Sequence, residues 1–364
     1  MKKFTRLSGL NQQPSPHQAT RRIERVTKAQ QQPQQLPRKQ LPSAAKKLQQ
    51  ARAQQLQQAR AKQPRIIRPP SRFLTSLAVT PTRLALPPGC FNAGLVRMLD
   101  SDTFVCVYRP NEHSFTACLL DAGLNVIKST LFPLGLSNCA DPRLVWLPDG
   151  KLLMVYSSVE EGGRKFECIR GAVIMDLART TAFIKPERFR ISPKSDVRQK
   201  NWMPFVHLGV VHFVASVKPH IVYQMPRLYE EAVQVHESGW LSPWFTEEFL
   251  RGNTNPVQLD DGNYLGTFHS VIRTGKMHDY DNGCYVFEGK PPFRVLRAGV
   301  RTYLPAEAAI EPHFRKAGQI RVCFPVGMIR DGEQLLISYG DNDSAVKIMK
   351  TTVTEMLATT LEVY

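Results

Sequence analysis

Short apolar runs rich in Val, Ile, Phe and Tyr begin near Arg72 and alternate with tight polar turns along the rest of the chain. The same unit, an apolar run followed by a tight turn and a second apolar run, occurs five times. These units span residues 95–109, 144–157, 205–217, 257–269 and 320–339. Three of their turns contain Asp-Gly, which between β-rich runs is a strong hairpin signal. The pattern therefore predicts five β-hairpins.

The spacing of the five hairpins indicates how they are organised. Their turns begin near residues 100, 149, 208, 260 and 331, a period of roughly 50–70 residues, which suits a four-stranded sheet with its loops. Sheets repeated at such a period are more typical of a β-propeller than of a sandwich. Long amphipathic helical patterns are nearly absent, and residues 172–181 and 229–236 are the only weak helix candidates. We predict an all-β fold, a five-bladed β-propeller over residues 72–364.

The first 70 residues differ in composition from this body. They contain 16 Gln, 16 Lys and Arg, one acidic residue (Glu24) and one aromatic residue (Phe4), so they carry +15 of the formal net charge of +17. A segment with so few large apolar groups cannot bury enough surface to offset the entropy lost on ordering. We therefore predict a disordered, basic, Gln-rich tail over residues 1–71, followed by a nearly neutral globular body.

Several roles are open for this tail. Its charge suits an anionic partner, whether nucleic acid, an acidic protein or an anionic membrane surface. The sequence Leu-Gln-Gln-Ala-Arg-Ala occurs at Leu48 and again at Leu56, and its residues favour a transient helix. A solvated tail without a specific partner and an organelle transit peptide are the alternatives.

The cysteines indicate a reducing compartment. None of them shows CxxC or CxxxC spacing, their number is odd, and most lie inside apolar runs, as buried free thiols do. The seven are Cys90, Cys106, Cys118, Cys139, Cys168, Cys284 and Cys323. No apolar run approaches the roughly 18 residues of a membrane span. These features favour a cytoplasmic protein without a cysteine-based metal site.

Polar groups stand at both ends of the predicted hairpins. The innermost strands of a propeller surround a central channel, so equivalent strand ends converge there. Since hydrophobic strands do not require amide or charged groups at their ends, this recurrence predicts a polar pocket on the axis. The segments that carry these groups are Phe91-Asn92-Ala93-Gly94, Tyr108-Arg109, Asp141-Pro142-Arg143, Lys200-Asn201-Trp202-Met203-Pro204-Phe205, residues 264–269, Phe324-Pro325-Val326-Gly327 and Tyr339-Gly340-Asp341-Asn342-Asp343.

In their order along the chain, these segments resemble the motifs of glycoside hydrolase family 130. That family contains five-bladed propellers that act as inverting β-mannoside phosphorylases, together with related hydrolases and mannosyltransferases. The resemblance runs from about residue 90 to residue 345 and has no counterpart in the tail. It implies a carbohydrate-active enzyme that acts on β-mannosides or related glycosides by inverting phosphorolysis, or by the reverse transfer from a sugar-phosphate donor.

The resemblance also implies roles for individual residues. Asp141 matches the catalytic acid, which protonates the departing glycosidic oxygen through a sugar hydroxyl. Lys200 and His269 match phosphate contacts, and Arg143 is a further candidate because it is close to Asp141 in sequence. The groups expected to orient the sugar are Asn92, Arg109, Asn201 and Asp343. Inorganic phosphate or a sugar phosphate would be the co-substrate, with no other cofactor and no metal.

Two departures from the family pattern keep a second interpretation open. Ala140 occupies a position where the family usually has Glu, and the arginine cluster that follows the catalytic acid in typical phosphorylases is not clearly present. The alternative is a catalytically silent propeller that binds a glycan or a protein, with its basic tail bound to an anionic partner. The carboxylates of Asp341 and Asp343 could bind Ca²⁺, but the full calcium-loop pattern is missing, and hydrogen bonding to sugar hydroxyls or plain turn chemistry is favoured.

Overall fold

The computed structural model describes residues 81–111, 113–127, 132–158, 168–179, 182–194, 199–240, 250–274, 277–299, 303 and 322–363. Contacts between Cα atoms divide the chain into two units, residues 1–65 and 66–364, and every described residue belongs to the second unit. The N-terminal tail expected over residues 1–71, with its proposed helix and anionic partner, lies outside the described residues.

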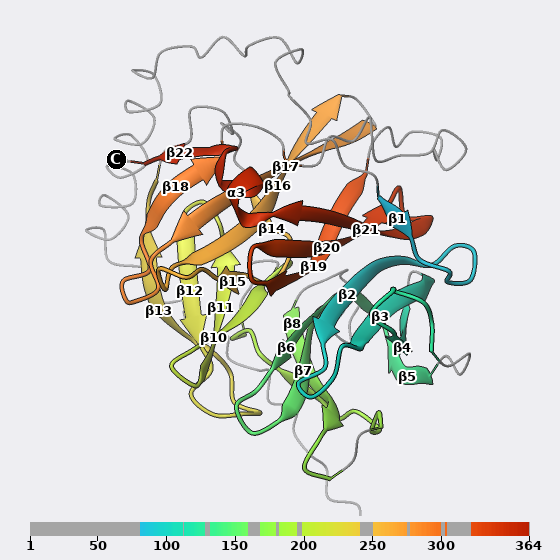
Figure 1. The fold of residues 1–364 in the computed structure, drawn as a ribbon. Coiled ribbons are helices and arrows are strands. Elements are labelled where there is room, and N and C mark those ends of the chain that lie inside the picture. Colours follow the sequence, from blue (N-terminus) through green and yellow to red (C-terminus); the bar gives the residue numbers. More distant parts are fainter. Residues whose placement is uncertain are drawn as a thin grey trace, which may run out of the picture. The chain divides into compact units, whose positions relative to one another are not determined.

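The described strands of this second unit form five antiparallel sheets, which are the blades of a propeller (Figure 1). The first blade consists of β2 (Phe91–Arg97), β3 (Phe104–Asn111), β4 (Ser114–Leu120) and β5 (Phe132–Ser137). The second consists of β6 (Cys139–Trp146), β7 (Lys151–Ser158), β8 (Cys168–Asp176) and β9 (Arg188–Arg190). The third consists of β10 (Met203–His207), β11 (Val210–Ser216), β12 (His220–Gln224) and β13 (Val233–Ser238).

The two remaining blades also hold the chain's first and last described strands. The fourth blade consists of β14 (Arg251–Gly252), β15 (Val257–Gln258), β16 (Tyr264–Thr274), β17 (Met277–Phe287), β18 (Val295–Gly299) and β22 (Thr360–Glu362). The fifth consists of β19 (Cys323–Asp331), β20 (Gln334–Asp341), β21 (Ala345–Thr352) and β1 (Thr82–Arg83). Because β1 precedes the first blade in the chain but pairs with β21 of the last, it ties the two ends of the propeller sequence together.

A short helix leads the chain from the fifth blade back to the fourth. Helix α3 (Val353–Leu357) begins with a capping box, in which the Thr352 hydroxyl accepts from the Glu355 amide and the Glu355 carboxylate accepts from the Thr352 amide. After α3, strand β22 pairs with β18. The residues that the structure describes include no helix that is long and apolar enough to span a membrane.

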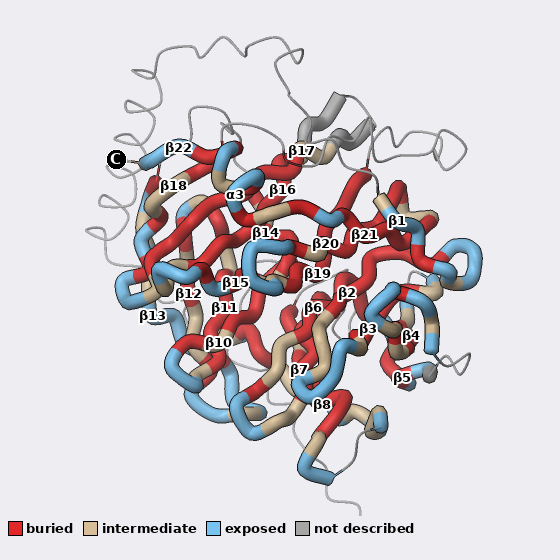
Figure 2. The backbone as a smooth tube through the Cα atoms, in the orientation of Figure 1, coloured by how far each residue is buried: buried red, intermediate tan, exposed pale blue. Residues whose placement is uncertain are grey.

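Five hydrophobic clusters lie between successive blades and define their cyclic order. On β3, Val105 and Val107 pack against the second blade, whereas Phe104 and Cys106 pack against the fifth. This division follows the alternation of side chains along a strand. Three further clusters join the second blade to the third, the third to the fourth and the fourth to the fifth. Burial is therefore concentrated on the inner strands, while the outer turns are exposed (Figure 2).

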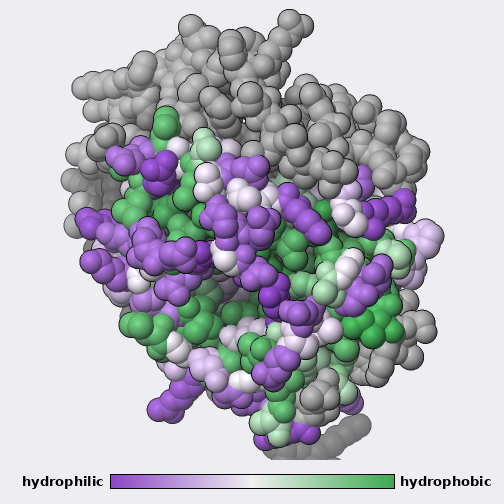
Figure 3. All heavy atoms as spheres, viewed as in Figure 1, coloured by the Kyte–Doolittle hydropathy of each residue, from purple (hydrophilic) through white to green (hydrophobic). Residues whose placement is uncertain are grey.

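The predicted hairpins and cysteine states are confirmed. The five hairpins correspond to the inner pairs β2–β3, β6–β7, β10–β11, β15–β16 and β19–β20. All seven cysteines are buried and free. On the face shown in Figure 3, hydrophilic side chains separate the hydrophobic patches of the described residues.

The two weak helix candidates were wrong. Residues 172–176 belong to β8, where they pair with β7, and residues 233–236 belong to β13, where they pair with β12. In β8, Ala172 and Ile174 share a face that packs against the first blade. Pairing with a neighbouring strand of the same blade thus decides in favour of strand over the weak helical pattern.

Acid is expected to destabilise the junction of the third and fourth blades through His220. Its imidazole is buried beside the rings of Tyr285 and Phe287, at centroid distances of 5.6 and 5.0 Å. Burial, with a smaller contribution from His236, lowers the pKa of His220 to about 3. The unfolded chain would protonate this residue near pH ~6.5, so stability should fall as the pH drops from about 6.5 towards 3, by about 1.4 kcal/mol per unit.

Replacement of His220 by Phe should remove the protonation of this position in the unfolded chain, and with it this part of the dependence of stability on pH. Between pH 7 and pH 5 we expect the unmodified protein to lose about 2 kcal/mol more unfolding free energy than the His220→Phe variant. Urea unfolding at the two pH values measures the difference, with His113→Phe at an exposed histidine as the control. Equal losses in the unmodified protein and the His220→Phe variant would contradict the prediction.

Candidate active site

Near the start of three inner strands lies a polar residue in left-handed backbone conformation. The φ angles are +48° at Asn92, +59° at Asp141 and +63° at Asn201. Asn and Asp tolerate this region better than other residues that carry a Cβ atom. At Asn92 and Asp141 the strand register also shifts, as at a β-bulge, which re-aims a side chain away from the regular alternation. This local geometry brings polar side chains from neighbouring blades together.

Asp141 lies at the centre of this group and is only 2% exposed. Its Oδ1 accepts a hydrogen bond from Asn92 Nδ2 at 3.0 Å and lies 3.4 Å from the Arg109 guanidinium, both on the first blade. Its Oδ2 lies 3.7 Å from Lys200 Nζ, just before the third blade. One carboxylate of the second blade therefore contacts groups from both neighbouring blades. A Cβ atom at position 340 would overlap Asn92 Oδ1, so Gly340 allows this arrangement.

Neighbouring cations keep the Asp141 carboxyl ionised. Burial raises the pKa of a carboxyl, but Lys200, Arg109, Arg143 and the Asn92 hydrogen bond together hold the pKa of Asp141 below its usual value. The group thus combines one negative charge with three positive ones. Such an excess of positive charge in a buried site suits the binding of an anion beside Asp141.

Arg143 is buried and connects the second blade to the fourth. Its guanidinium donates to the carbonyl oxygens of Asn253, Asp141 (3.1 Å) and Gly252 (3.3 Å). Burial lowers its pKa to about 10, so it stays charged at neutral pH. Three of its five N–H donors are therefore used on backbone carbonyls, and its position is set by the backbone of both blades.

His269, on β16 and 1% exposed, joins the group through Asn253. Its Nδ1 lies 2.5 Å from Asn253 Oδ1, and the Asn253 carbonyl accepts from Arg143. The imidazole stacks on Tyr280 at 4.7 Å, with Phe324 against it at 5.2 Å. Burial and then the nearby cations hold the pKa of His269 well below its usual value, so the ring is neutral.

The remaining two candidates differ in position. Asn201 is buried next to Lys200; its backbone N–H donates to the Ser157 hydroxyl at 3.4 Å, while its Oδ1 has no hydrogen-bond partner among the described residues. Asp343 is half-buried in the turn between β20 and β21, with a φ of +52°, and is not among the contacts of Asp141. The structure thus brings together Asn92, Arg109, Asp141, Arg143 and Lys200, with His269 and Asn201 adjoining them, whereas Asp343 lies in the turn between β20 and β21.

Sequence reasoning gave no role to two residues of this region. Asn253 lies in a polar segment before a hairpin, like Asn92 and Asn201, so its position was a usable signal. Asn282 lies within β17 and carries no such signal, yet it donates from Nδ2 to the Cys323 carbonyl at 3.1 Å and accepts from Asn253 at 3.0 Å. In the described part of the chain, no group of three or more His, Cys, Asp and Glu side chains is placed to hold a metal ion.

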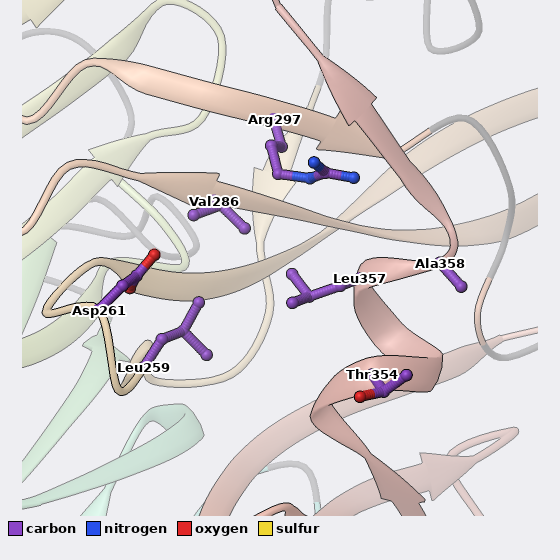
Figure 4. A pocket seen from close by; sticks show the side chains of 7 residues that line it. All are labelled: Leu259, Asp261, Val286, Arg297, Thr354, Leu357 and Ala358. Carbon is purple, nitrogen blue, oxygen red and sulfur yellow. The ribbon is translucent and has the colours of Figure 1, made fainter.

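A separate pocket of about 470 Å³ lies where the fourth blade meets α3 (Figure 4). Leu259, Val286 and Leu357 give it an apolar surface, and Asp261 and Arg297 are its charged lining residues. None of the candidate site residues lines it.

Comparison with known proteins supports the fold and identifies the family. A phosphorylase from Listeria innocua that acts on β-1,2-mannobiose superposes with a TM-score of 0.53 at 15% identity, covering 77% of this chain and 96% of its own. A glycosyl hydrolase from Bacteroides ovatus superposes with a TM-score of 0.56 at 12% identity, covering 79% and 94%. A search among curated proteins found no match.

The family model described as beta-1,4-mannooligosaccharide phosphorylase matches residues 133–362. This range includes Asp141, Arg143, Lys200 and His269, whereas Asn92 and Arg109 of the first blade precede it. Since the match covers more than half of the sequence, the chain belongs to glycoside hydrolase family 130.

Proposed function

We propose that the protein is an inverting glycoside phosphorylase or glycosyltransferase that acts on β-mannosides or related glycosides. It would cleave the glycosidic bond with inorganic phosphate, or transfer the sugar from a sugar phosphate to an acceptor hydroxyl. The observation that carries the proposal is the buried carboxylate of Asp141, in contact with Asn92, Arg109 and Lys200.

Asp141 is assigned the proton transfer. In phosphorolysis, a phosphate oxygen forms the new bond to the anomeric carbon while the bond to the leaving oxygen breaks on the opposite face. The leaving oxygen takes a proton that Asp141 supplies through a sugar hydroxyl. The ionised form of Asp141 suits the reverse direction, in which the carboxylate accepts the proton of the attacking hydroxyl.

Binding of the anion would prepare Asp141 for the forward direction. The cations Lys200, Arg109 and Arg143 hold the pKa of Asp141 down, and a phosphate dianion beside them would offset their effect. The pKa of Asp141 would then rise, and the carboxyl would take up the proton that it must donate. Because phosphate is itself the attacking anion, the protein needs no general base.

We assign the phosphate to Lys200, His269 and Arg143, with two N–H donors of Arg143 remaining beyond its carbonyl contacts. Asn92, Arg109, Asn201 and Asp343 are assigned to the sugar. Asn201 supports this most directly, since its buried Oδ1, which has no partner in the described part of the chain, offers an acceptor to a sugar hydroxyl. An unsatisfied buried polar atom costs about 1–3 kcal/mol, which a bound hydroxyl would recover.

A catalytically silent glycan-binding propeller is the second candidate, and Ala140 favours it. This buried position on β6 lies directly before Asp141 and carries no carboxylate. The same residues would then bind the sugar without turning it over.

The full chain incubated with mannose 1-phosphate or GDP-mannose and a set of acceptor sugars tests the proposal. Release of phosphate or nucleotide, with formation of a β-linked product, is the expected result. Calorimetry with the same sugars in parallel detects binding. Binding without turnover of any donor would favour the silent propeller and contradict the enzyme.

A further inference from the structure

A chain of side-chain amides leads from the backbone of the fifth blade to the imidazole of His269. Asn282 Nδ2 donates to the Cys323 carbonyl at 3.1 Å, and Asn253 Nδ2 donates to Asn282 Oδ1 at 3.0 Å. The chain ends at His269 Nδ1, 2.5 Å from Asn253 Oδ1. Asn253 and Asn282 are both fully buried.

The direction of every hydrogen bond in this chain follows from its first member. A backbone carbonyl can only accept, so Asn282 must present its NH₂ group to Cys323 and its oxygen to Asn253. Asn253 must then donate to Asn282 and present its own oxygen to His269. An amide oxygen also only accepts, and His269 Nδ1 therefore carries a hydrogen.

The main chain keeps the members of this chain in register. Asn282 is the direct cross-strand partner of His269 in the β16–β17 pair. The backbone N–H of Asn253 donates to the Thr267 carbonyl at 3.0 Å, and its carbonyl accepts from Arg143. Rotation of either amide would place oxygen against oxygen or N–H against N–H between fully buried groups, which is costly.

A neutral imidazole with hydrogen on Nδ1 has a bare lone pair on Nε2. The surroundings of His269 favour the neutral form, because burial and the cations Arg251, Lys200 and Arg143 outweigh the opposing effect of Asp141. Among the described residues, the hydrogen bond that His269 makes is formed by Nδ1, with Asn253. The nitrogen left for a ligand is thus an acceptor, although three cations lie near the ring.

We propose that the Asn282–Asn253 chain makes His269 Nε2 a hydrogen-bond acceptor, so that the site selects an anion that carries a hydroxyl, monohydrogen phosphate, over sulfate. The inference rests on the proposed function in placing phosphate at His269. Asn253 and Asn282 are positioning residues, because they act through the imidazole and not on the ligand.

The selectivity follows from the protons of the two anions. At neutral pH phosphate keeps at least one P–OH group, which donates a hydrogen bond to His269 Nε2. The other phosphate oxygens accept from Lys200 and from the Arg143 guanidinium. Sulfate has no hydrogen at that pH. A sulfate oxygen that faces Nε2 would therefore place its lone pair against the lone pair of the nitrogen, and the two atoms would repel each other. The cations attract both anions, so only the acceptor distinguishes them.

Two measurements on the full chain, neither requiring turnover, test the inference. Nitrogen-15 NMR of histidine-labelled protein, with the His269→Gln variant to assign the resonance, should show Nδ1 protonated and Nε2 unprotonated at neutral pH. Titration with phosphate and with sulfate at constant ionic strength should give at least about tenfold weaker binding of sulfate, since one lost hydrogen bond is worth about that factor.

A substitution of Asn253 should abolish the preference for phosphate. In Asn253→Asp, the carboxylate would stabilise the imidazolium, Nε2 would become a donor, and the ratio of the two dissociation constants should fall to about one. Asn255→Asp is the matched control, because Asn255 lies in the same loop but bonds to Met328, and it should keep the unmodified ratio. The wild-type measurements remain decisive if Asn253→Asp does not fold.

The outcomes separate this inference from the proposed function. A protonated Nε2, or equal affinities for phosphate and sulfate in the unmodified protein, would overturn the inference even if the enzyme is active. A change in the nitrogen-15 chemical shift of Nε2 on addition of mannose, but not on addition of phosphate, would also overturn the inference. The Nε2 acceptor would then bind a sugar hydroxyl and not the anion. If the protein shows the expected tautomer and the expected preference for phosphate but no turnover, only the proposed function would be contradicted.

Discussion

Replacement of Asp141 by Asn is expected to lower glycosyl transfer by about 10²–10⁴-fold, the usual contribution of a positioned proton donor or acceptor. Asn keeps the size of the side chain but can neither take up nor release the proton. The initial rate of phosphate release from mannose 1-phosphate, measured with the best acceptor sugar, tests this. The effect should appear in kcat, because the proton moves in the transition state.

Binding of phosphate provides the control for this variant. Removal of the carboxylate takes one negative charge away from Lys200, Arg109 and Arg143, so phosphate affinity should be unchanged or higher. Asp149→Asn, at an exposed turn of the same blade, should leave the rate unchanged. Unaltered turnover in folded Asp141→Asn would contradict the mechanism, whereas loss of phosphate binding together with turnover would indicate a disrupted site.

Replacement of Lys347 by Met is expected to cost about 3–5 kcal/mol of unfolding free energy. Lys347 Nζ on β21 lies 2.7 Å from Asp341 Oδ2 at the end of β20, and both side chains are buried. Met fills much of the space of the lysine stem but leaves the Asp341 carboxylate without the opposing charge of this lysine. Urea unfolding of the full chain, followed by circular dichroism, measures the loss.

Two further variants show whether the loss arises from the uncompensated charge. Adding Asp341→Asn to Lys347→Met should recover part of the stability, because the buried negative charge is then gone. Arg97→Met serves as the exposed counterpart: Arg97 pairs with Asp331 at the same 2.7 Å, but both groups are partly exposed, and the expected loss is about 0–1 kcal/mol. Equal losses in Lys347→Met and Arg97→Met would contradict this account.

Local features of the chain were read correctly from the sequence. Each inner hairpin consists of two neighbouring strands and a short turn, so its pairing depends on residues that are close in sequence. Asn92, Asp141 and Asn201 stood out as candidates for the same reason, since each lies near the start of an inner strand. The weak helical patterns at residues 172–181 and 229–236 failed because pairing of these segments with β7 and β12 outweighs local propensity.

Contacts of the candidate site that cross between blades were not accessible in this way. Arg143 was expected to contact phosphate, but the sequence does not reveal that three of its donors bind carbonyls of Asp141 and of the fourth blade. Asn282 was missed altogether, because it is one polar residue inside a long strand. Its role depends on Asn253 and Cys323, which are 29 and 41 residues away in the chain.

The sequence by itself thus determined the five hairpins, their period and the polar groups at their ends, since these follow from residue types over short stretches. It also separated the basic segment of residues 1–70 from the nearly neutral body. Only the tertiary structure decided which of the polar groups meet at Asp141 and in which protonation state they do so. The reason is physical: burial and neighbouring charges set the pKa of Asp141 and His269, and both depend on side chains from different blades.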